Sequence, residues 1–125
     1  MFRTPQTVAT LSHTSVVLSV AFSPDGKTLA TAGDPDTVRL WDVAGRNTIA
    51  TLTGSVSSVA FSPDSKTLAT ASGDKSVKLW DVAGRNTVAT LTGHTGEVSS
   101  VAFSPDGETL ATGSFDKSAK LWPTR

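Results

Sequence analysis

Residues 87–122 read TVATLTGHTGEVSSVAFSPDGETLATGSFDKSAKLW, and this stretch is the fullest copy of a unit that the rest of the chain repeats. Shorter copies of the same text surround Phe22 and Phe61. The tryptophans recur at the same interval of about forty residues, as Trp41, Trp80 and Trp122. A period of this length is typical of proteins built from stacked supersecondary units, so it is the strongest indication of the architecture.

The unit has the pattern of a four-stranded antiparallel sheet. The apolar run 98–103 and the β-branched run 109–113 predict two strands, and Ser-Pro-Asp-Gly at 104–107 predicts the tight turn between them. A second polar turn precedes a strand at 118–122, and the TVATL text at 87–91 supplies a further strand. No segment has a helical period, and four strands in about forty residues leave no room for a helix.

The same pattern extends over the whole chain, residues 1–125, and predicts an all-β protein with twelve strands. The strands are expected at 7–11; at 16–22, 28–32, 37–41 and 48–52 in repeat one; at 56–61, 67–71, 76–80 and 87–91 in repeat two; and at 98–103, 109–113 and 118–122 in repeat three. Repeat three therefore lacks a fourth strand. The lone strand at the other end of the chain, Thr7-Val8-Ala9-Thr10-Leu11, matches residues 87–91 letter for letter.

Composition narrows the classes of function. Lys plus Arg and Asp plus Glu both number 11, so the formal net charge is zero, which argues against electrostatic capture of nucleic acid or of an anionic membrane. No apolar run approaches the roughly 18 residues of a membrane span, and the first residues lack the apolar segment of a signal peptide. The absence of cysteine excludes disulfides and thiolate metal sites. We expect a cytoplasmic chain that binds no cofactor.

Three short motifs carry a family resemblance. They are the Gly-His pair at 93–94, the Ser-Pro-Asp-Gly turn, and the Leu-Trp-Asp triplets at 40–42 and 79–81. On these motifs the chain resembles the WD-repeat family of β-propellers, from about residue 7 to residue 122. The resemblance implies three blades, each a four-stranded antiparallel sheet.

The blades implied by the resemblance are residues 16–52 for blade one, 56–91 for blade two, and 98–122 for the first three strands of blade three. In this family the sequence repeat is offset from the blade, so the outer strand of the last blade comes from the N-terminus. Residues 6–11 would therefore supply that outer strand.

The resemblance also implies a hydrogen-bonded tetrad in blade three, formed by His94, Thr112, Asp116 and Trp122. Such a network gives a buried imidazole and a buried indole N–H their partners. The other repeats keep partial sets: His13, Thr31 and Trp41 in repeat one, with Pro35 at the Asp position between Asp34 and Asp36; and Thr70, Asp74 and Trp80 in repeat two, with no histidine. We therefore expect blade two to be the least rigid on this rim.

Three blades are too few to close a propeller, because closed propellers have four to eight. An isolated set would expose the apolar faces of its first and last blades, which monomers rarely tolerate. Two chains would give six blades and three chains nine, so a homodimer is favoured, a homotrimer is next, and a fragment of a larger propeller is the third alternative. In a closed ring, residues 6–11 would complete blade three of a partner chain.

The first turn of each repeat is polar and local. Ser65 replaces the glycine of the Ser-Pro-Asp-Gly turn, where a positive φ would cost roughly 1 kcal/mol, so Ser65→Gly is expected to stabilise the chain. Asp25, Asp64 and Asp106 each follow proline in such a turn. Aspartate is favoured there for its own backbone hydrogen bonds, so we do not expect a metal site.

The expected function is an interaction scaffold without catalysis. No nucleophile with an adjacent base is indicated, because both histidines stand at the structural position of the family. A peptide or protein partner is expected on the rim that carries the second turns, and Phe115 is the suggested anchor. The alternative is a purely structural, engineered or amplified repeat protein without a specific ligand, which the near-identical linkers at 42–54 and 81–93 favour. The other candidate rim residues are Glu97, Gly73, Pro35 and Ser55.

Overall fold

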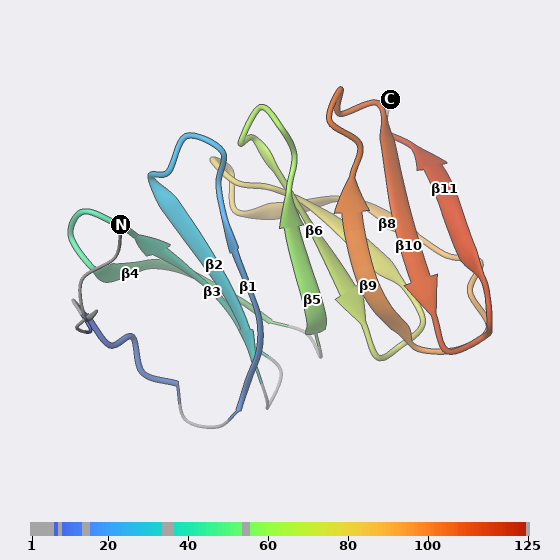
Figure 1. Ribbon diagram of the computed structural model, residues 1–125, viewed down its shortest axis with the longest axis horizontal. Helices are drawn as coiled ribbons and strands as arrows, with labels where there is room; N and C mark the ends of the chain where they lie inside the picture. Colours follow the sequence, from blue (N-terminus) through green and yellow to red (C-terminus); the bar gives the residue numbers. More distant parts are fainter. Residues whose placement is uncertain (1–6, 8, 14–15, 34–36, 54–55, 125) are drawn as a thin grey trace, which may run out of the picture.

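Three antiparallel sheets stand side by side in the order of the sequence (Figure 1). The computed structural model describes residues 7, 9–13, 16–33, 37–53 and 56–124. These residues contain eleven strands and no helix, which confirms the all-β prediction. Two sheets have four strands and the third has three.

Each sheet is a meander in which neighbours in sequence are neighbours in space. The strand bounds agree with the predicted ones to within one residue at each end. Blade one contains β1 (Val17–Phe22), β2 (Thr28–Gly33), β3 (Thr37–Asp42) and β4 (Asn47–Thr53); blade two contains β5 (Val56–Phe61), β6 (Thr67–Ser72), β7 (Val77–Asp81) and β8 (Asn86–Leu91); blade three contains β9 (Val98–Phe103), β10 (Thr109–Ser114) and β11 (Ala119–Pro123).

The twelfth predicted strand is not formed within the single chain. Thr7 and residues 9–11 are in no strand, and Val8 lies outside the described residues. Strand β11 pairs with β10 alone among the described residues, so its other edge is open. The predicted partner of residues 7–11 belongs to a second chain, and that pairing stays a prediction.

The first strand of each blade lies on the inner side of the fan. Strand β1 contacts β5, and β5 contacts β9. Hydrogen bonds link these inner strands: the Ser57 hydroxyl donates to the carbonyl of Val98 at 2.9 Å, and the amide of Val59 donates to Ser19 Oγ at 3.3 Å. The blades therefore radiate from a shared inner edge, as in a propeller.

The Ser-Pro-Asp turns hold themselves together. In the first turn, the Ser23 hydroxyl donates to Asp25 Oδ1 at 2.6 Å, and the amide of Lys27 donates to the same oxygen at 3.0 Å. The amide of Thr28 in turn donates to Ser23 Oγ at 3.0 Å. The same three bonds recur in the other two turns. The aspartate carboxylates are therefore engaged in local turn geometry, as aspartate commonly is in turns.

The glycine of the turn between the third and fourth strands is crowded by two side chains. A Cβ on Gly45 would lie 2.4 Å from Asn47 Oδ1 and 2.7 Å from Asp42 Oδ2. The left-handed conformation belongs to the next residue, Arg46, with a φ of 57°, and to Arg85 in the second copy. A side chain at Gly45 would have to displace the side-chain ends of Asn47 and Asp42.

Two hydrophobic clusters hold the blades together. One lies between blades one and two, and the other lies between blades two and three. In both, large side chains of the later blade pack on small and medium side chains of the earlier one. Between blades one and two these are Val56, Val59, Phe61, Leu68 and Trp80 against Ala30, Ala32, Val38, Leu40 and Leu52.

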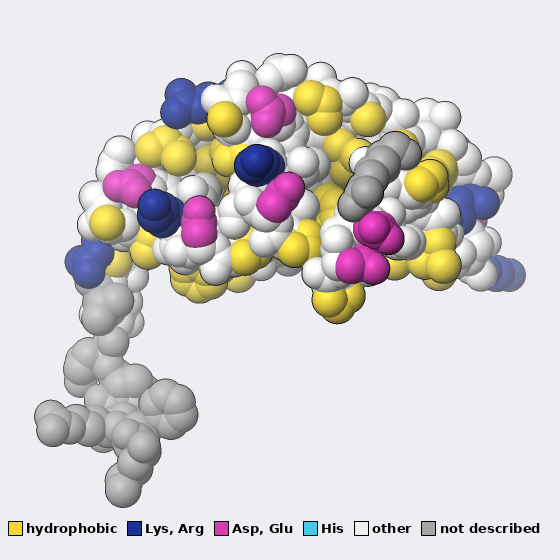
Figure 2. All heavy atoms as spheres, turned by 90° about the horizontal axis from the view of Figure 1, so that it is seen from above, with side chains coloured by type: hydrophobic (Ala, Val, Ile, Leu, Met, Phe, Trp, Pro, Cys, Tyr) yellow, Lys and Arg dark blue, Asp and Glu magenta, His cyan; other side chains and the backbone are white. Residues whose placement is uncertain are grey.

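Seen from the rim that carries the Ser-Pro-Asp turns, acidic and basic side chains are interspersed, with hydrophobic side chains between them (Figure 2). The mixed signs agree with the zero net charge of the chain. Among the described residues there is no helix that is long and apolar enough to span a membrane.

Candidate functional site

The four residues predicted for the blade-three tetrad lie in one hydrogen-bonded network. The two ring nitrogens of His94 lie 2.8 Å from Asp116 Oδ2 and 2.7 Å from Thr112 Oγ1. The indole Nε1 of Trp122 donates to the same Thr112 oxygen at 2.9 Å. His94 and Thr112 are buried, so this network satisfies polar atoms that would otherwise be costly to bury.

A fifth member, Ser118, was missed by the sequence analysis. Its hydroxyl lies 2.5 Å from Asp116 Oδ1 and is the main cause that holds the pKa of Asp116 below its ordinary value of 3.8. Hydrogen bonds from the His94 ring and the Thr95 amide lower the pKa further, while burial opposes them. The signal was present in the sequence, because Ser76 follows Asp74 at the same spacing.

Blade one has three of the four tetrad positions in contact. His13 Nε2 lies 2.6 Å from Thr31 Oγ1, and Trp41 Nε1 donates to that oxygen at 2.9 Å. Burial, followed by the nearby charge of Arg39, lowers the pKa of His13 below its ordinary value of 6.5. The fourth position falls within residues 34–36, which lie outside the described residues.

Blade two has the smallest network. Trp80 Nε1 donates to Thr70 Oγ1 at 2.9 Å, and Thr70 is fully buried. Asp74 takes no part in this pair, because its Oδ1 accepts from the hydroxyl of Ser76 at 2.5 Å. The sequence set Thr70, Asp74 and Trp80 therefore divides into a buried pair and a separate turn.

Phe115 is the exposed aromatic on the predicted partner rim. Its side chain is 72% exposed, while its amide donates to the carbonyl of Glu97 at 2.9 Å, which ties the turn to the preceding linker. Glu97 is exposed and Gly73 is half-buried. The other two predicted rim residues, Pro35 and Ser55, lie outside the described residues.

The face of blade one that points away from blade two is apolar and is not covered by another blade. Phe22 is 64% exposed, whereas Phe61, at the same position of the next repeat, is 9% exposed. We call this surface the blade-one face; it consists of Val17, Val20, Phe22 and Leu29, the counterparts of Val56, Val59, Phe61 and Leu68. These counterparts are the large side chains that blade two packs against blade one.

The face of blade three that points away from blade two is likewise not covered by another blade. Leu121 is 74% exposed, whereas its counterparts Leu40 and Leu79 are 1% and 8% exposed. We call this surface the blade-three face; it consists of Ala102, Ala111, Gly113, Ala119 and Leu121. It carries the small and medium side chains on which a following blade packs. The repeat pattern predicted open faces at both ends, and the exposures of Phe22 and Leu121 confirm them.

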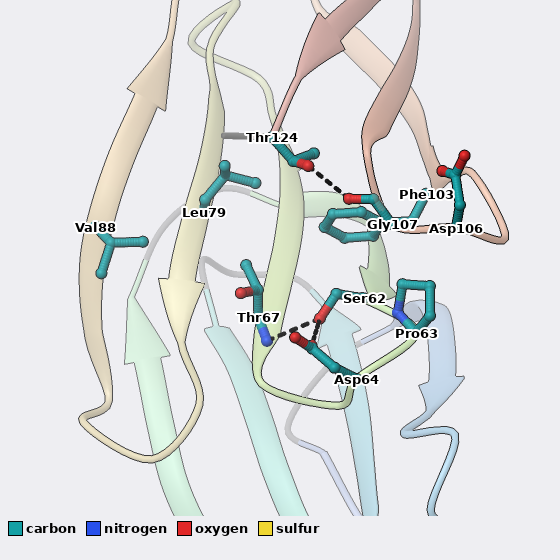
Figure 3. A pocket seen from close by; sticks show the side chains of 10 residues that line it. All are labelled: Ser62, Pro63, Asp64, Thr67, Leu79, Val88, Phe103, Asp106, Gly107 and Thr124. Atoms are coloured by element: carbon teal, nitrogen blue, oxygen red, sulfur yellow. Dashed lines mark hydrogen bonds between the residues drawn. The ribbon is translucent and has the colours of Figure 1, made fainter.

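A cavity of about 310 Å³ opens between the turns of blades two and three (Figure 3). Leu79, Val88 and Phe103 form its apolar wall. Thr124, whose hydroxyl donates to the Gly107 carbonyl at 2.5 Å, lies at its edge. Between blades one and two, the counterpart of Thr124 is Val82, which packs against the hydrophobic cluster.

Metal-binding groups are not indicated by the described residues, in which no three His, Asp or Glu side chains gather as metal ligands. Asp25, Asp64 and Asp106 stand in separate turns, each bonded to its own serine hydroxyl.

Residues 5–42, 46–81 and 85–123 match the family model described as WD domain, G-beta repeat. The chain belongs to the WD40 repeat family. The three matches confirm three repeats, and the motifs at 40–42, 79–81 and 93–94 lie one in each matched range.

Two relatives of this WD40 chain show how much of a longer protein it resembles. It is 54% identical over 41 residues to the Notchless protein homolog of Arabidopsis thaliana; the match covers 33% of this chain and 8% of the relative. The solved structure of U3-55K superposes with a TM-score of 0.86 at 24% identity, over 90% of this chain and 37% of that one. The second likeness shows the fold, and the chain spans a minor part of either relative.

Proposed function

We propose that this WD40 chain is a protein-interaction scaffold without catalytic activity, which associates with further copies of itself to complete its propeller. A ring of two chains with six blades is favoured over a ring of three chains with nine. In either ring, residues 6–11 of one chain complete blade three of its partner.

The contrast between the two open faces and their buried counterparts carries the proposal. The blade-one face offers large side chains, and the blade-three face offers small ones with Leu121 among them. The same combination is buried twice within the chain, between blades one and two and between blades two and three. Close packing of such complementary shapes excludes water from about as much apolar surface as an internal interface does.

Mass in solution tests the association. Sedimentation or native mass spectrometry should give twice the mass of one chain, and three times the mass would replace six blades by nine. A stable monomer at micromolar concentration would overturn the proposal.

Variants of the open faces make the test specific. Phe22→Asp places a charge on the blade-one face, and we expect it to lower the mass to that of one chain. Phe22 is exposed in the single chain, so the substitution leaves the core of the blades intact. Phe115→Asp is the matched control. Phe115 is also an exposed phenylalanine, but it lies in the turn between β10 and β11 and not on an end face, so this variant should keep the assembled mass.

Binding of a protein partner is expected on one rim of the assembled ring, the rim that carries the turns between the second and third strands of each blade. Phe115 supports this part of the proposal, because an exposed aromatic on a turn that is tied to its linker is a pre-organised anchor. A partner held by the immobilised chain and released by Phe115→Ala would support the rim. A partner that binds the parent chain and the Phe115→Ala variant equally well would contradict a role for Phe115.

A further inference from the structure

Two residues of the segment before β1, Ala9 and Leu11, lie beside the blade-one face. Ala9 and Leu11 line a cavity of about 290 Å³ together with Phe22, Leu29 and Trp41. Trp41 is 6% exposed even though no blade covers this face of blade one. The segment therefore shields part of the face that the rest of the chain leaves open.

Two polar contacts hold this segment in place. The guanidinium of Arg39 donates to the carbonyl of Ser12 at 3.0 Å, and His13 bonds to Thr31. Both contacts lie within four residues of Ala9, so the end of the segment is anchored close to the cavity. An anchored strand loses less conformational freedom on pairing than a loose one.

Residues 9–13 lie beside blade one as β8, the outer strand of blade two, and its linker lie beside blade three. In the internal interface, Leu91 at the end of β8 and Trp122 both pack against the cluster that contains Val98 and Leu110. Leu11 lines one cavity with the counterparts of Leu110 and Trp122 on blade one, which are Leu29 and Trp41. The histidines agree, since His94 and His13 both bond to the threonine of the blade that follows. Residues 9–13 thus follow the course that β8 and its linker take beside blade three.

The pairing of β7 with β8 supplies the register. Leu91 faces Val77, Thr90 faces Lys78 and Ala89 faces Leu79. The register then shifts, so that Thr87 faces Trp80. Strand β11 has the counterpart text, with Ala119, Lys120, Leu121 and Trp122 in place of Val77, Lys78, Leu79 and Trp80.

We propose that β11 of a second copy pairs with residues 7–11 in this register, and that its Leu121 fills the cavity on the blade-one face. The pairs are Leu11 with Ala119, Thr10 with Lys120, Ala9 with Leu121, and Thr7 with Trp122 across a bulge. This arrangement rests on the proposed self-association and specifies its interface. It gives partners to the open edge of β11, which otherwise is a template for irregular pairing.

Leu121 fits the cavity because its counterpart already occupies the same kind of place. Leu79 belongs to the cluster between blades two and three and lies beside Phe103. Phe22 is the counterpart of Phe103, and it lines the cavity on the blade-one face. A leucine entering there brings the apolar groups of both chains out of water together.

A cysteine pair tests the register. The chain has no cysteine, so a chain with Thr10→Cys and Lys120→Cys contains only the two introduced thiols. Directly opposed residues of an antiparallel pair have Cα atoms about 4.5–5.5 Å apart, within the range for a disulfide. Mild oxidation should give a covalent dimer, or a trimer for a nine-bladed ring, on a non-reducing gel.

The matched control is the pair Ala9→Cys and Lys120→Cys. A slip of one residue turns side chains to the opposite face of the strand, so this pair should remain reduced under the same conditions. A crosslink within one chain is not expected, because the segment and β11 lie at opposite ends of the fan (Figure 1).

The mass of each reduced variant separates the two proposals. A monomeric mass would overturn the proposed association and this inference together. An assembled mass with crosslinking of the control pair, with crosslinking within one chain, or with no crosslinking of the first pair would overturn the register alone. An assembled mass with an intermolecular bridge in the first pair only is the result that supports it.

Discussion

Ser65 has a left-handed backbone, with a φ of 64°, in a turn where Gly26 and Gly107 hold the same conformation in the other repeats. A side chain in this region costs roughly 1 kcal/mol. We expect Ser65→Gly to raise the free energy of unfolding by somewhat less than this, because it also removes a 3.3 Å hydrogen bond from the amide of Asp25 to Ser65 Oγ. Thermal melts at fixed chain concentration measure the gain.

The neighbour Lys66 supplies the control for this prediction. Its φ is not positive, so Lys66→Gly adds backbone freedom to the unfolded chain without relieving strain, and it should lower the melting temperature. An equal effect of both substitutions would mean that the conformation of Ser65 carries no strain.

His13 gives stability a dependence on pH near neutrality. Its pKa is lowered by burial in the folded state, while the unfolded chain keeps the ordinary value of 6.5. The unfolded state therefore binds more protons as pH falls below 6.5, and the free energy of unfolding should fall with it. Above that pH the contribution is complete.

His13→Gln should remove this limb of the stability curve, measured by denaturant unfolding between pH 7.5 and pH 5. The acid limb should persist in the variant, because the lowered pKa of Asp116 contributes stability that is lost only as pH falls below 3.8. An unchanged slope between pH 7.5 and pH 5 would contradict the role of His13.

For single residues, the sequence predicted the contacts of those side chains whose type and position belong to the family motif. The tetrad side chains His94, Thr112 and Trp122 meet as the family motif implies. The left-handed Arg46 and Arg85 could not be found in the same way, because arginine has no preference for that conformation. The adjacent glycines, Gly45 and Gly84, do not have a positive φ themselves.

Among the elements, the turns between the second and third strands of blades two and three differ in how they are tied to the linker. In blade three, Phe115 and Thr95 donate their amides to Glu97 and Asp116 respectively. Both aspartates bond to the serines of their own turns, so these two bonds to the linker are the difference between the blades. We expect faster hydrogen exchange at the Asp74 amide than at the Asp116 amide.

The strand amides provide the internal reference for that measurement. Thr70 and Thr112 are both buried in central strands, and Thr70 lies in the blade that is covered on both faces. The contrast is therefore expected in the turns more than in the strands. Slower exchange at Thr70 and Asp74 than at Thr112 and Asp116 would contradict the lower rigidity of the blade-two rim.

Strand positions were predictable because each turn has distinct chemistry. Proline and aspartate after Phe22, Phe61 and Phe103 end the inner strands, and the structure ends them at those residues. The status of residues 7–11 could not be predicted for the single chain. Their sequence is that of a strand, but a strand needs a neighbour to pair with, and in the single chain Ala9 and Leu11 lie beside a blade face instead.

For the molecule as a whole, association should make stability depend on concentration. Anything that binds the folded chain stabilises it by mass action, by up to about 1.4 kcal/mol for each tenfold rise in concentration. We expect the melting temperature to rise by several degrees per tenfold increase, and Leu121→Asp to remove the dependence. A melting temperature that is independent of concentration in the parent chain would contradict association.

Val88→Asp is the control for the whole molecule. Val88 is exposed like Leu121, but it lies on the outer strand of blade two rather than on an open end face. The concentration dependence should therefore survive this substitution.

The number of repeats could be predicted from the sequence, whereas the number of blades in a closed ring could not. The blade number depends on the angle between blades, which side-chain packing sets.

The two end faces have an evolutionary consequence. Each blade packs its large side chains on the preceding blade and offers its small ones to the following blade. Duplication or loss of a whole repeat in the gene therefore leaves the same two surfaces at the ends. Repeat number can then change by recombination without any new contact surface having to arise. Fusion of two such genes would join the copies covalently and turn an association between molecules into a property of one polypeptide.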